Sequence, residues 1–299
     1  MKTILLTGKH GQVGWELQRT LAPLGKVIAL DAEDLDLADA EAIRRKVREV
    51  QPHIIVNPAA YTAVDKAESE PGLAMAINGI APGVFAEEAK VLDALLVHYS
   101  TDYIFDGSKQ GAYVEDDTPN PLGVYGQTKL AGEQAIRAAG CKHLILRTSW
   151  VYGARGKNFL LTMLKLAKER SELSIVDDQI GAPTWSRTLG EITAQILSQL
   201  HAPGRMQAEL EKLYGTYHLT SLGEVSWYGF TTEILQQAAI HPGPALHPIP
   251  TSAYPTPAAR PRNSRLSNDK LLDAFGLSGG DWQDNLQLCM QELKASARA

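Results

Sequence analysis

Short apolar, β-branched runs alternate with longer segments of helical period along the first half of the chain. The runs predict buried strands, and they cover residues 3–7, 26–31, 53–57, 95–101 and 143–149. Between them, helical spacing covers residues 15–21, 39–50, 72–90 and 124–139. Alternating strand–helix units of this length predict an α/β fold, a Rossmann-type doubly wound parallel sheet with right-handed crossovers.

The second half of the chain mixes the two patterns less regularly. Helical period covers residues 158–169, 184–200, 226–239 and 282–296, and short strands are expected near 174–177 and 215–220. We therefore expect residues 1–150 to form the parallel-sheet domain, with later segments returning to it. Residues 151–299 are expected to form mainly a smaller, mixed α/β lobe that binds the substrate.

A glycine loop follows the first predicted strand directly. It reads Gly8-Lys-His-Gly11-Gln-Val-Gly14, and a helical segment comes after it. Strand, glycines and helix are the context of a dinucleotide fingerprint, in which the backbone approaches a pyrophosphate and the helix N-terminus favours its charge. The loop thus predicts that the domain of residues 1–150 binds NAD(P). Its spacing is G-x-x-G-x-x-G rather than the commoner G-x-G-x-x-G, so a plain tight turn is the alternative.

Asp31 ends the second predicted strand, 23 residues after Gly8. A carboxylate near this distance hydrogen-bonds the adenosine ribose hydroxyls of NAD(H). The same carboxylate would repel the 2′-phosphate of NADP(H). Asp31 therefore predicts a preference for NADH, and an aspartate that only caps a helix or a loop is the alternative.

Two further groups point to chemistry at the carboxyl ends of the strands, where ligands bind in such sheets. Thr101, between Ser100 and Asp102, closes the fourth strand, and a hydroxyl there can donate to a carbonyl oxygen as negative charge develops on it. Tyr125 and Lys129 are four residues apart, which places both on one helix face. A nearby ammonium lowers the pKa of a phenol, about 10 in isolation, and makes it a usable general acid. A Ser/Thr turn and a chance Tyr-x-x-x-Lys are the alternatives.

Composition excludes several classes of protein. The 299 residues are 44% hydrophobic and 21% charged, with a net charge of −5, so no global positive charge favours nucleic acid or an anionic membrane. The apolar run at the N-terminus is far too short for a signal peptide, and no stretch approaches a membrane span. The two cysteines, Cys141 and Cys289, lack metal-ligand spacing. A cytoplasmic protein without nucleic-acid or membrane partners is expected.

With these pieces in order, the chain resembles the extended short-chain dehydrogenase/reductase family, and within it the reductases of dTDP-linked 4-keto-6-deoxy sugars. The resemblance spans nearly the whole chain, which makes it more specific than any one motif. The segments that carry it are Leu6-Thr-Gly-Lys-His-Gly-Gln-Val-Gly-Trp-Glu-Leu, Ala63-Val-Asp-Lys-Ala-Glu, Ser100-Thr-Asp-Tyr-Ile-Phe, Val124-Tyr-Gly-Gln-Thr-Lys, Arg147-Thr-Ser-Trp-Val-Tyr, Asp178-Gln-Ile-Gly-Ala-Pro-Thr, Pro255-Thr-Pro and Arg260-Pro-Arg-Asn-Ser-Arg-Leu.

The resemblance implies hydride transfer from NADPH or NADH to C4 of dTDP-4-dehydro-β-L-rhamnose, which gives dTDP-L-rhamnose. Thr101, Tyr125 and Lys129 fall on the family's catalytic positions. Thr101 would bind the carbonyl oxygen and Tyr125 would donate the proton. Lys129 would lower the pKa of Tyr125 and hold the nicotinamide ribose. Besides Gly8, Gly14, Tyr125 and Lys129, the residues expected to contact the cofactor are Gly11, Gln12, Val13, Asp31, Asp36, Leu37, Ala59, Ala60, Tyr61 and Tyr99.

Contacts with the dTDP-sugar are expected from both halves of the chain. Thr101, Asp102 and Trp150 fall where the family contacts the sugar nucleotide. An aromatic residue such as Trp150 at the end of a strand could cover a sugar ring, and a core or rim tryptophan is the alternative. A basic cluster in an otherwise acidic chain suits a diphosphate, with a solvated basic loop as the alternative. It consists of Arg260, Arg262 and Arg265.

The resemblance also raises a shared Mg²⁺, which some family members hold through glutamates of paired subunits. Glu16 and Glu292 match two of these positions. The third position falls in Trp185-Ser-Arg187, which offers no carboxylate and adds a cation. The loss of one hard oxygen ligand argues against the metal, whereas a homodimer of another kind stays open.

Two other functions stay open at this point. A related sugar-nucleotide epimerase or dehydratase resembles this chain, although dehydratases usually carry an acidic pair after the catalytic threonine, and here Tyr103 follows Asp102. A non-catalytic, cofactor-sensing regulatory subunit could retain the glycine loop, but the presence of Thr101, Tyr125 and Lys129 argues against it. Consumption of cofactor in proportion to product would distinguish the reductase from both.

Overall fold

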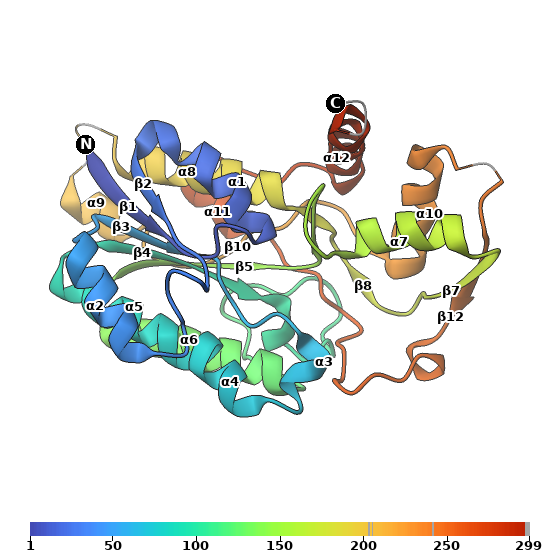
Figure 1. Ribbon diagram of the computed structural model, residues 1–299, viewed down its shortest axis with the longest axis horizontal. Coiled ribbons are helices and arrows are strands. Elements are labelled where there is room, and N and C mark those ends of the chain that lie inside the picture. Colours follow the sequence, from blue (N-terminus) through green and yellow to red (C-terminus); the bar gives the residue numbers. More distant parts are fainter. Residues whose placement is uncertain (203, 205, 241, 297–299) are drawn as a thin grey trace.

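A six-stranded parallel sheet forms the centre of the computed structural model, which describes residues 1–202, 204, 206–240 and 242–296 (Figure 1). The strand order is β10-β5-β4-β3-β1-β2, and each neighbouring pair is parallel. The prediction of a doubly wound α/β fold is confirmed. The strands are β1 (Lys2–Leu6), β2 (Gly25–Ala29), β3 (Ile54–Asn57), β4 (Leu95–Thr101), β5 (Lys142–Thr148) and β10 (Gly215–His218).

Helices cover both faces of this sheet, because its strands are apolar on both sides. Ile4 and Leu6 of β1 pack into one core, whereas Leu5 between them packs into the other, as the alternation of a strand requires. The first core lies under α1 (Gln12–Thr20), α8 (Ser186–Leu200) and α11 (Asp269–Phe275), above the sheet in Figure 1. The second lies under α2 (Ala40–Val50), α5 (Ala81–Val91) and α6 (Val124–Ala139), below it.

The two largest differences from the predicted helix bounds have local reasons. α1 begins at Gln12, three residues earlier than predicted, because Gly11 is extended and its carbonyl accepts the N–H of Trp15 at 2.9 Å. The predicted helix over residues 72–90 is interrupted: α4 (Pro71–Met75) and α5 are joined by a π-helical turn, η2 (Ala76–Ile80). Pro82 has no N–H to donate to the carbonyl of residue 78, so the α-helical bond pattern cannot run through it.

The smaller lobe lies beyond the carboxyl ends of the sheet strands (Figure 1). Its core joins Tyr152, Phe230 and Trp282. The strand β12 (Ala245–Ile249) was not predicted from the sequence. It contains Pro248, which a two-stranded sheet tolerates because both strands are edges. The lobe contains α7 (Phe159–Glu169), α10 (Trp227–Ala238) and α12 (Trp282–Ser296), with the strand pairs β7 (Glu172–Val176) and β12 (Ala245–Ile249), β8 (Ile180–Gly181) and β11 (Val225–Ser226), and β6 (Val151–Tyr152) and β9 (Thr184–Trp185).

Short elements complete the chain. They are α3 (Val64–Ala67), α9 (Gln207–Glu211) and the 3₁₀ turns η1 (Ala22–Leu24), η3 (Asp102–Ile104) and η4 (Thr251–Ala253). Within the described part of the chain, none of the helices is both long enough and apolar enough to cross a membrane.

The direction of winding reverses between β1 and β3, which are neighbours in the sheet. The chain leaves β1 toward one side and β3 toward the other, so the connections after these two strands separate and leave a crevice. Ligands of open parallel sheets bind at this point, outside the carboxyl ends of the strands. The glycine loop follows β1, and the segment that begins at Pro58 follows β3.

Candidate active site

A groove opens at this crevice. It consists of a cavity of about 450 Å³ and an adjoining one of about 170 Å³, and both are lined by Gly8, Asp31, Ala59 and Ala60. With the exception of Tyr61, each residue expected to contact the cofactor lines one of the two cavities. Besides the four shared residues, these are Gly11, Gln12, Val13, Gly14, Tyr99, Tyr125 and Lys129 in the larger cavity and Asp36 and Leu37 in the smaller one.

The glycine loop forms a cradle of bare backbone at the floor of the groove. Gly8 has a positive φ of 63°, and its carbonyl accepts the N–H of Gly11 at 2.9 Å. A Cβ on Gly14 would lie 1.9 Å from the same carbonyl oxygen, so only glycine fits there. The first turn of α1 follows immediately, with its N-terminus at the groove. These features fit a dinucleotide pyrophosphate.

Carboxylates gather at the far end of the groove. Asp31 accepts the backbone N–H groups of His10 and Ala32, each at 2.8 Å. Lys9 contacts Asp34 at 2.5 Å and Glu33 at 3.5 Å. Asp31 is thus held by backbone donors and its charge is not matched by a lysine or arginine within the described residues, as expected for a partner of the ribose hydroxyls.

Tyr125 and Lys129 reach the groove from the first turns of α6. The carboxylate of Glu68 accepts the N–H of Val124 at 2.9 Å and so fixes the start of this helix. A Cβ on Gly126 would lie 2.1 Å from the carbonyl oxygen of Tyr103, which means that α6 rests directly on the turn after β4. This close approach brings Tyr125 beside Thr101.

The pKa of Tyr125 moves in the opposite direction from the one predicted. Burial raises it to about 12, the hydrogen bond with Thr101 works against that rise, and the charge of Asp102 adds to it. The Lys129 ammonium donates instead to the carbonyl of Tyr99 at 2.6 Å and lies 3.1 Å from Nε2 of His98. The four-residue spacing correctly predicted that Tyr125 and Lys129 share one face of the helix. The direction of the Lys129 side chain, however, is set by the buried acceptors on β4.

Thr101 and Asp102 are buried beside Tyr125. The Thr101 hydroxyl donates to Asp102 Oδ1 at 3.0 Å and accepts the N–H of Tyr103 at 3.1 Å. Burial raises the pKa of Asp102 to about 6, against the effect of the hydroxyls of Ser264 and Thr101. Because water solvates this carboxylate poorly, a hydrogen bond from a hydroxyl group stabilises its charged form.

Trp150 and the three arginines of the basic cluster are engaged with other side chains. Trp150 stacks on Trp227 with 3.5 Å between ring centroids. The basic cluster is divided among separate carboxylates, so it is not a free patch of positive charge. The ion pairs are Arg260–Asp65 at 2.8 Å, Arg265–Glu224 at 2.9 Å and Arg262–Asp178 at 4.0 Å.

The two glutamates considered for Mg²⁺ hold a guanidinium instead. Arg187 Nε lies 3.5 Å from Glu16 Oε2, and its Nη2 lies 3.1 Å from Glu292 Oε1. Among the described residues, no group of three or more His, Cys, Asp or Glu side chains could hold a metal ion. A cation already lies between the two carboxylates, so the residues do not fit the metal.

Several residues that line the groove were not predicted from the sequence. Pro58 and Thr62 belong to a segment of small and polar residues after β3, and that position was itself the signal. Gly156 and Lys157 come from the loop after β6 and carry no motif. The other such residues are His10, Thr148 and Val151 in the larger cavity and Thr7, Leu30, Ala32, Leu35 and Ile77 in the smaller one.

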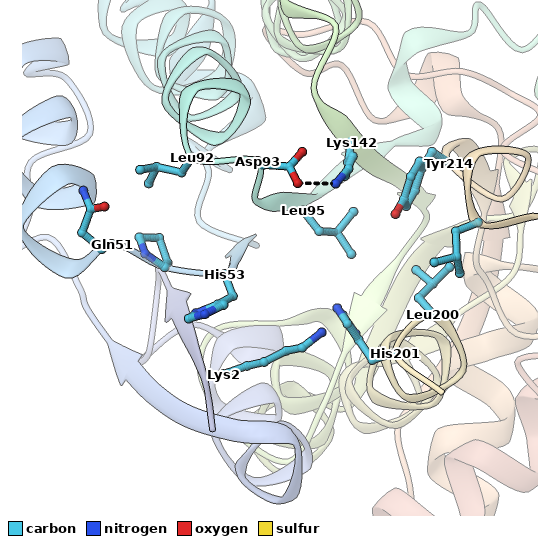
Figure 2. Close-up of a pocket in the computed structure, with 12 residues that line it drawn as sticks. Lys2, Gln51, His53, Leu92, Asp93, Leu95, Lys142, Leu200, His201 and Tyr214 are labelled. Carbon is cyan, nitrogen blue, oxygen red and sulfur yellow. Dashed lines mark hydrogen bonds and ion pairs between the residues drawn. The ribbon is translucent and has the colours of Figure 1, made fainter. Parts of the chain in front are cut away.

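Another cavity, of about 520 Å³, lies away from the groove, at the ends of the sheet where the parallel strands begin (Figure 2). It is lined by Lys2, His53 and Leu200, and by the ion pair of Lys142 with Asp93 at 2.7 Å. Figure 2 shows these groups around the rim, with leucines between them. Ligands of parallel sheets bind at the carboxyl ends of the strands, where the groove lies. Tyr125 and Lys129 also line the groove, so it is the candidate active site.

The chain is similar to known proteins along nearly its whole length. The family model described as RmlD substrate binding domain matches residues 1–295. A dTDP-4-dehydrorhamnose reductase of Burkholderia thailandensis is 48% identical over 296 residues, covering 97% of this chain and 98% of the relative. One of Escherichia coli K12 is 46% identical over 298 residues, covering 97% of each. The crystal structure of dTDP-4-dehydrorhamnose reductase from Bacillus anthracis in complex with NADP has a TM-score of 0.89 at 36% identity, covering 97% and 99%.

Proposed function

The chain belongs to the dTDP-4-dehydrorhamnose reductase family, and from this we propose that it reduces the C4 ketone of dTDP-4-dehydro-β-L-rhamnose to give dTDP-L-rhamnose. The observation that carries the proposal is that Tyr125 and Lys129 line the same groove as the glycine loop. A proton donor and a dinucleotide cradle therefore face one space. NADPH or NADH, when bound, supplies the hydride.

Tyr125 is the proton donor in this proposal. With its pKa raised to about 12, the phenol is fully protonated near neutral pH. Hydride addition turns the C4 carbonyl oxygen into an alkoxide, which is about as basic as hydroxide, whose conjugate acid has a pKa of about 16. Proton transfer from Tyr125 to that oxygen is therefore downhill. It breaks the O–H bond of the tyrosine, forms that of the product alcohol, and leaves a phenolate that solvent reprotonates.

Thr101 and Lys129 prepare this transfer. The Thr101 hydroxyl lies beside the phenol and can turn from Asp102 to the substrate oxygen as negative charge develops there. Lys129 places an ammonium at the same wall of the groove, where it holds the nicotinamide ribose. Trp150, Arg260 and Arg265 remain the proposed contacts of the sugar and the diphosphate, with Arg260 and Arg265 turning from their ion pairs to do so.

The direct test is consumption of cofactor. Incubation with enzymatically prepared dTDP-4-dehydro-β-L-rhamnose should oxidise one NADPH for each dTDP-L-rhamnose formed, followed by absorbance and by chromatography of the product. A cofactor that stays bound and is never consumed would indicate an epimerase. Binding of NADPH without turnover would indicate a regulatory protein.

Exchange of Asp31 for asparagine should shift the choice of cofactor toward NADPH. Asparagine retains an oxygen for the N–H of His10 but removes the charge that opposes a 2′-phosphate. Removal of one such repulsion at a partly solvated site should raise the ratio of kcat/KM for NADPH over NADH about tenfold. Asp39→Asn, at the N-cap of α2 and outside the groove, is the matched control. An unchanged ratio in Asp31→Asn would place the carboxylate away from the ribose.

Turnover should not require a divalent metal, since Arg187 supplies the positive charge between Glu16 and Glu292. Dialysis against EDTA should leave kcat unchanged, and added Mg²⁺ should not raise it. The variant Arg187→Glu brings three carboxylates together and should gain thermal stability with Mg²⁺. Loss of wild-type activity in EDTA with recovery in Mg²⁺ would refute this expectation.

A further inference from the structure

A chain of buried polar groups runs beneath the groove and ends at Lys129. The hydroxyl of Thr7 lies 2.6 Å from Asn57 Oδ1, Asn57 Nδ2 lies 3.2 Å from His98 Nδ1, and His98 Nε2 lies 3.1 Å from Lys129 Nζ. None of the four side chains is more than 2% exposed. Asn57 and His98 line neither cavity of the groove, so the hydrogens between them must be assigned within the chain.

The two ring nitrogens of His98 cannot both accept. A neutral imidazole has one N–H and one lone pair. If the amide of Asn57 donates to Nδ1, then Nε2 carries the hydrogen, and Lys129 has to be an uncharged amine to accept it. If Nδ1 carries the hydrogen and donates to the Asn57 oxygen, then Nε2 presents its lone pair to a charged Lys129. The second arrangement only exchanges the oxygen and nitrogen of the Asn57 amide, which then donates to Thr7.

The doubly protonated ring is excluded by its surroundings. Burial and the adjacent Lys129 charge hold the pKa of His98 well below its usual range. The choice therefore lies between a neutral His98 with a charged lysine and a neutral His98 with an uncharged one.

We infer that His98 is a positioning residue, whose Nε2 lone pair accepts a hydrogen bond from the Lys129 ammonium and keeps it charged and directed along the wall of the groove. This inference rests on the proposed role of Lys129. The carbonyl of Tyr99 takes a second N–H, so the third remains for the cofactor ribose. With the lysine held at two points, its rotation is restricted before the cofactor enters.

Other charges around Lys129 do not replace this contact. Burial lowers the pKa of Lys129 to about 8, and the charge of Glu133, on the same helix, partly offsets the fall. Glu133 is itself bound by Arg147 of β5 at 2.8 Å and by Arg137 at 3.1 Å. Tyr99 contributes its carbonyl, and its hydroxyl is paired with Thr193. Tyr125, also on α6, is neutral near physiological pH. Among the described residues, His98 is thus the side chain that contacts the ammonium directly.

The test compares two substitutions of the histidine. His98→Leu removes the acceptor, so the pKa of Lys129 falls further, and the loss of kcat/KM at alkaline pH should begin about one pH unit lower. At neutral pH, kcat should fall about tenfold with little change in KM for the sugar nucleotide. His98→Gln, whose amide oxygen can accept from the ammonium, should restore the wild-type profile. His143→Gln, near the start of β5 and far from the carboxyl ends of the strands, is the control.

A spectroscopic measurement separates this inference from the proposed function. Nitrogen NMR on protein labelled in histidine should show His98 with its hydrogen on Nδ1 below the pKa of Lys129, whether or not any sugar nucleotide is turned over. Hydrogen on Nε2 at neutral pH would overturn the inference. So would a folded, NADPH-binding His98→Leu variant that keeps the wild-type alkaline limb, or a glutamine variant that fails to restore it.

Discussion

Replacement of Tyr125 by phenylalanine should lower kcat about 10²–10⁴-fold, the usual contribution of a positioned general acid. The ring keeps its edge-to-face contact with Tyr103, at 5.5 Å between centroids, and the glycine loop is untouched. NADPH should therefore bind with nearly the wild-type affinity. The alkoxide would then have to take its proton from water or from another group that is not positioned for the transfer.

Stopped-flow measurement of NADPH oxidation under single-turnover conditions checks this expectation, with fluorescence titration for cofactor binding. Tyr103→Phe is the matched control, because it removes a neighbouring hydroxyl from a residue that does not line the groove. Turnover of Tyr125→Phe close to that of the wild type would show that another group donates the proton. Asp102, whose pKa is raised to about 6, would then be the next candidate.

The sheet could be predicted from the sequence because its strands are buried on both faces. Such strands appear as continuous apolar runs, and β4 begins and ends at its predicted residues. The place of the site followed from the same pattern, since the ends of parallel strands converge at one edge. Gly8, Asp31 and Ala59 belong to different strand ends, yet each was assigned to the groove that they line together.

Contacts between distant segments could not be predicted in this way. Arg260 is matched by Asp65, 195 residues earlier in the chain, and a count of positive charges in one loop cannot show that. The direction of the Tyr125 pKa depends on burial, which spacing on a helix does not report. The link from Asn57 through His98 to Lys129 joins β3, β4 and α6, and each residue alone is ordinary in a buried strand or helix.

At Gly14, sequence and structure both indicate that the helix α1 packs closely against the turn after β1. Its motif suggested close packing of strand and helix, and the structure gives the reason in atomic terms: a Cβ would lie 1.9 Å from the carbonyl oxygen of Gly8 and 2.7 Å from its carbonyl carbon. Gly8 cannot move away easily, because Ala59 lies against it: a Cβ built on Gly8 would be 3.1 Å from the Cβ of Ala59. A methyl group on Gly14 must therefore displace the start of α1 from the groove.

Gly14→Ala should weaken NADPH binding about 10²-fold, since a displacement of about 1 Å at a positioning element has effects of that order. The free energy of unfolding should also fall by about 1–3 kcal/mol, as expected for an overpacked contact. Calorimetric titration and urea denaturation measure the two effects. Gly72→Ala, where a Cβ would meet nothing within 4 Å, should change neither. Wild-type affinity in Gly14→Ala would mean that the loop absorbs the methyl group, and the pyrophosphate would then have to be held by donors other than this turn.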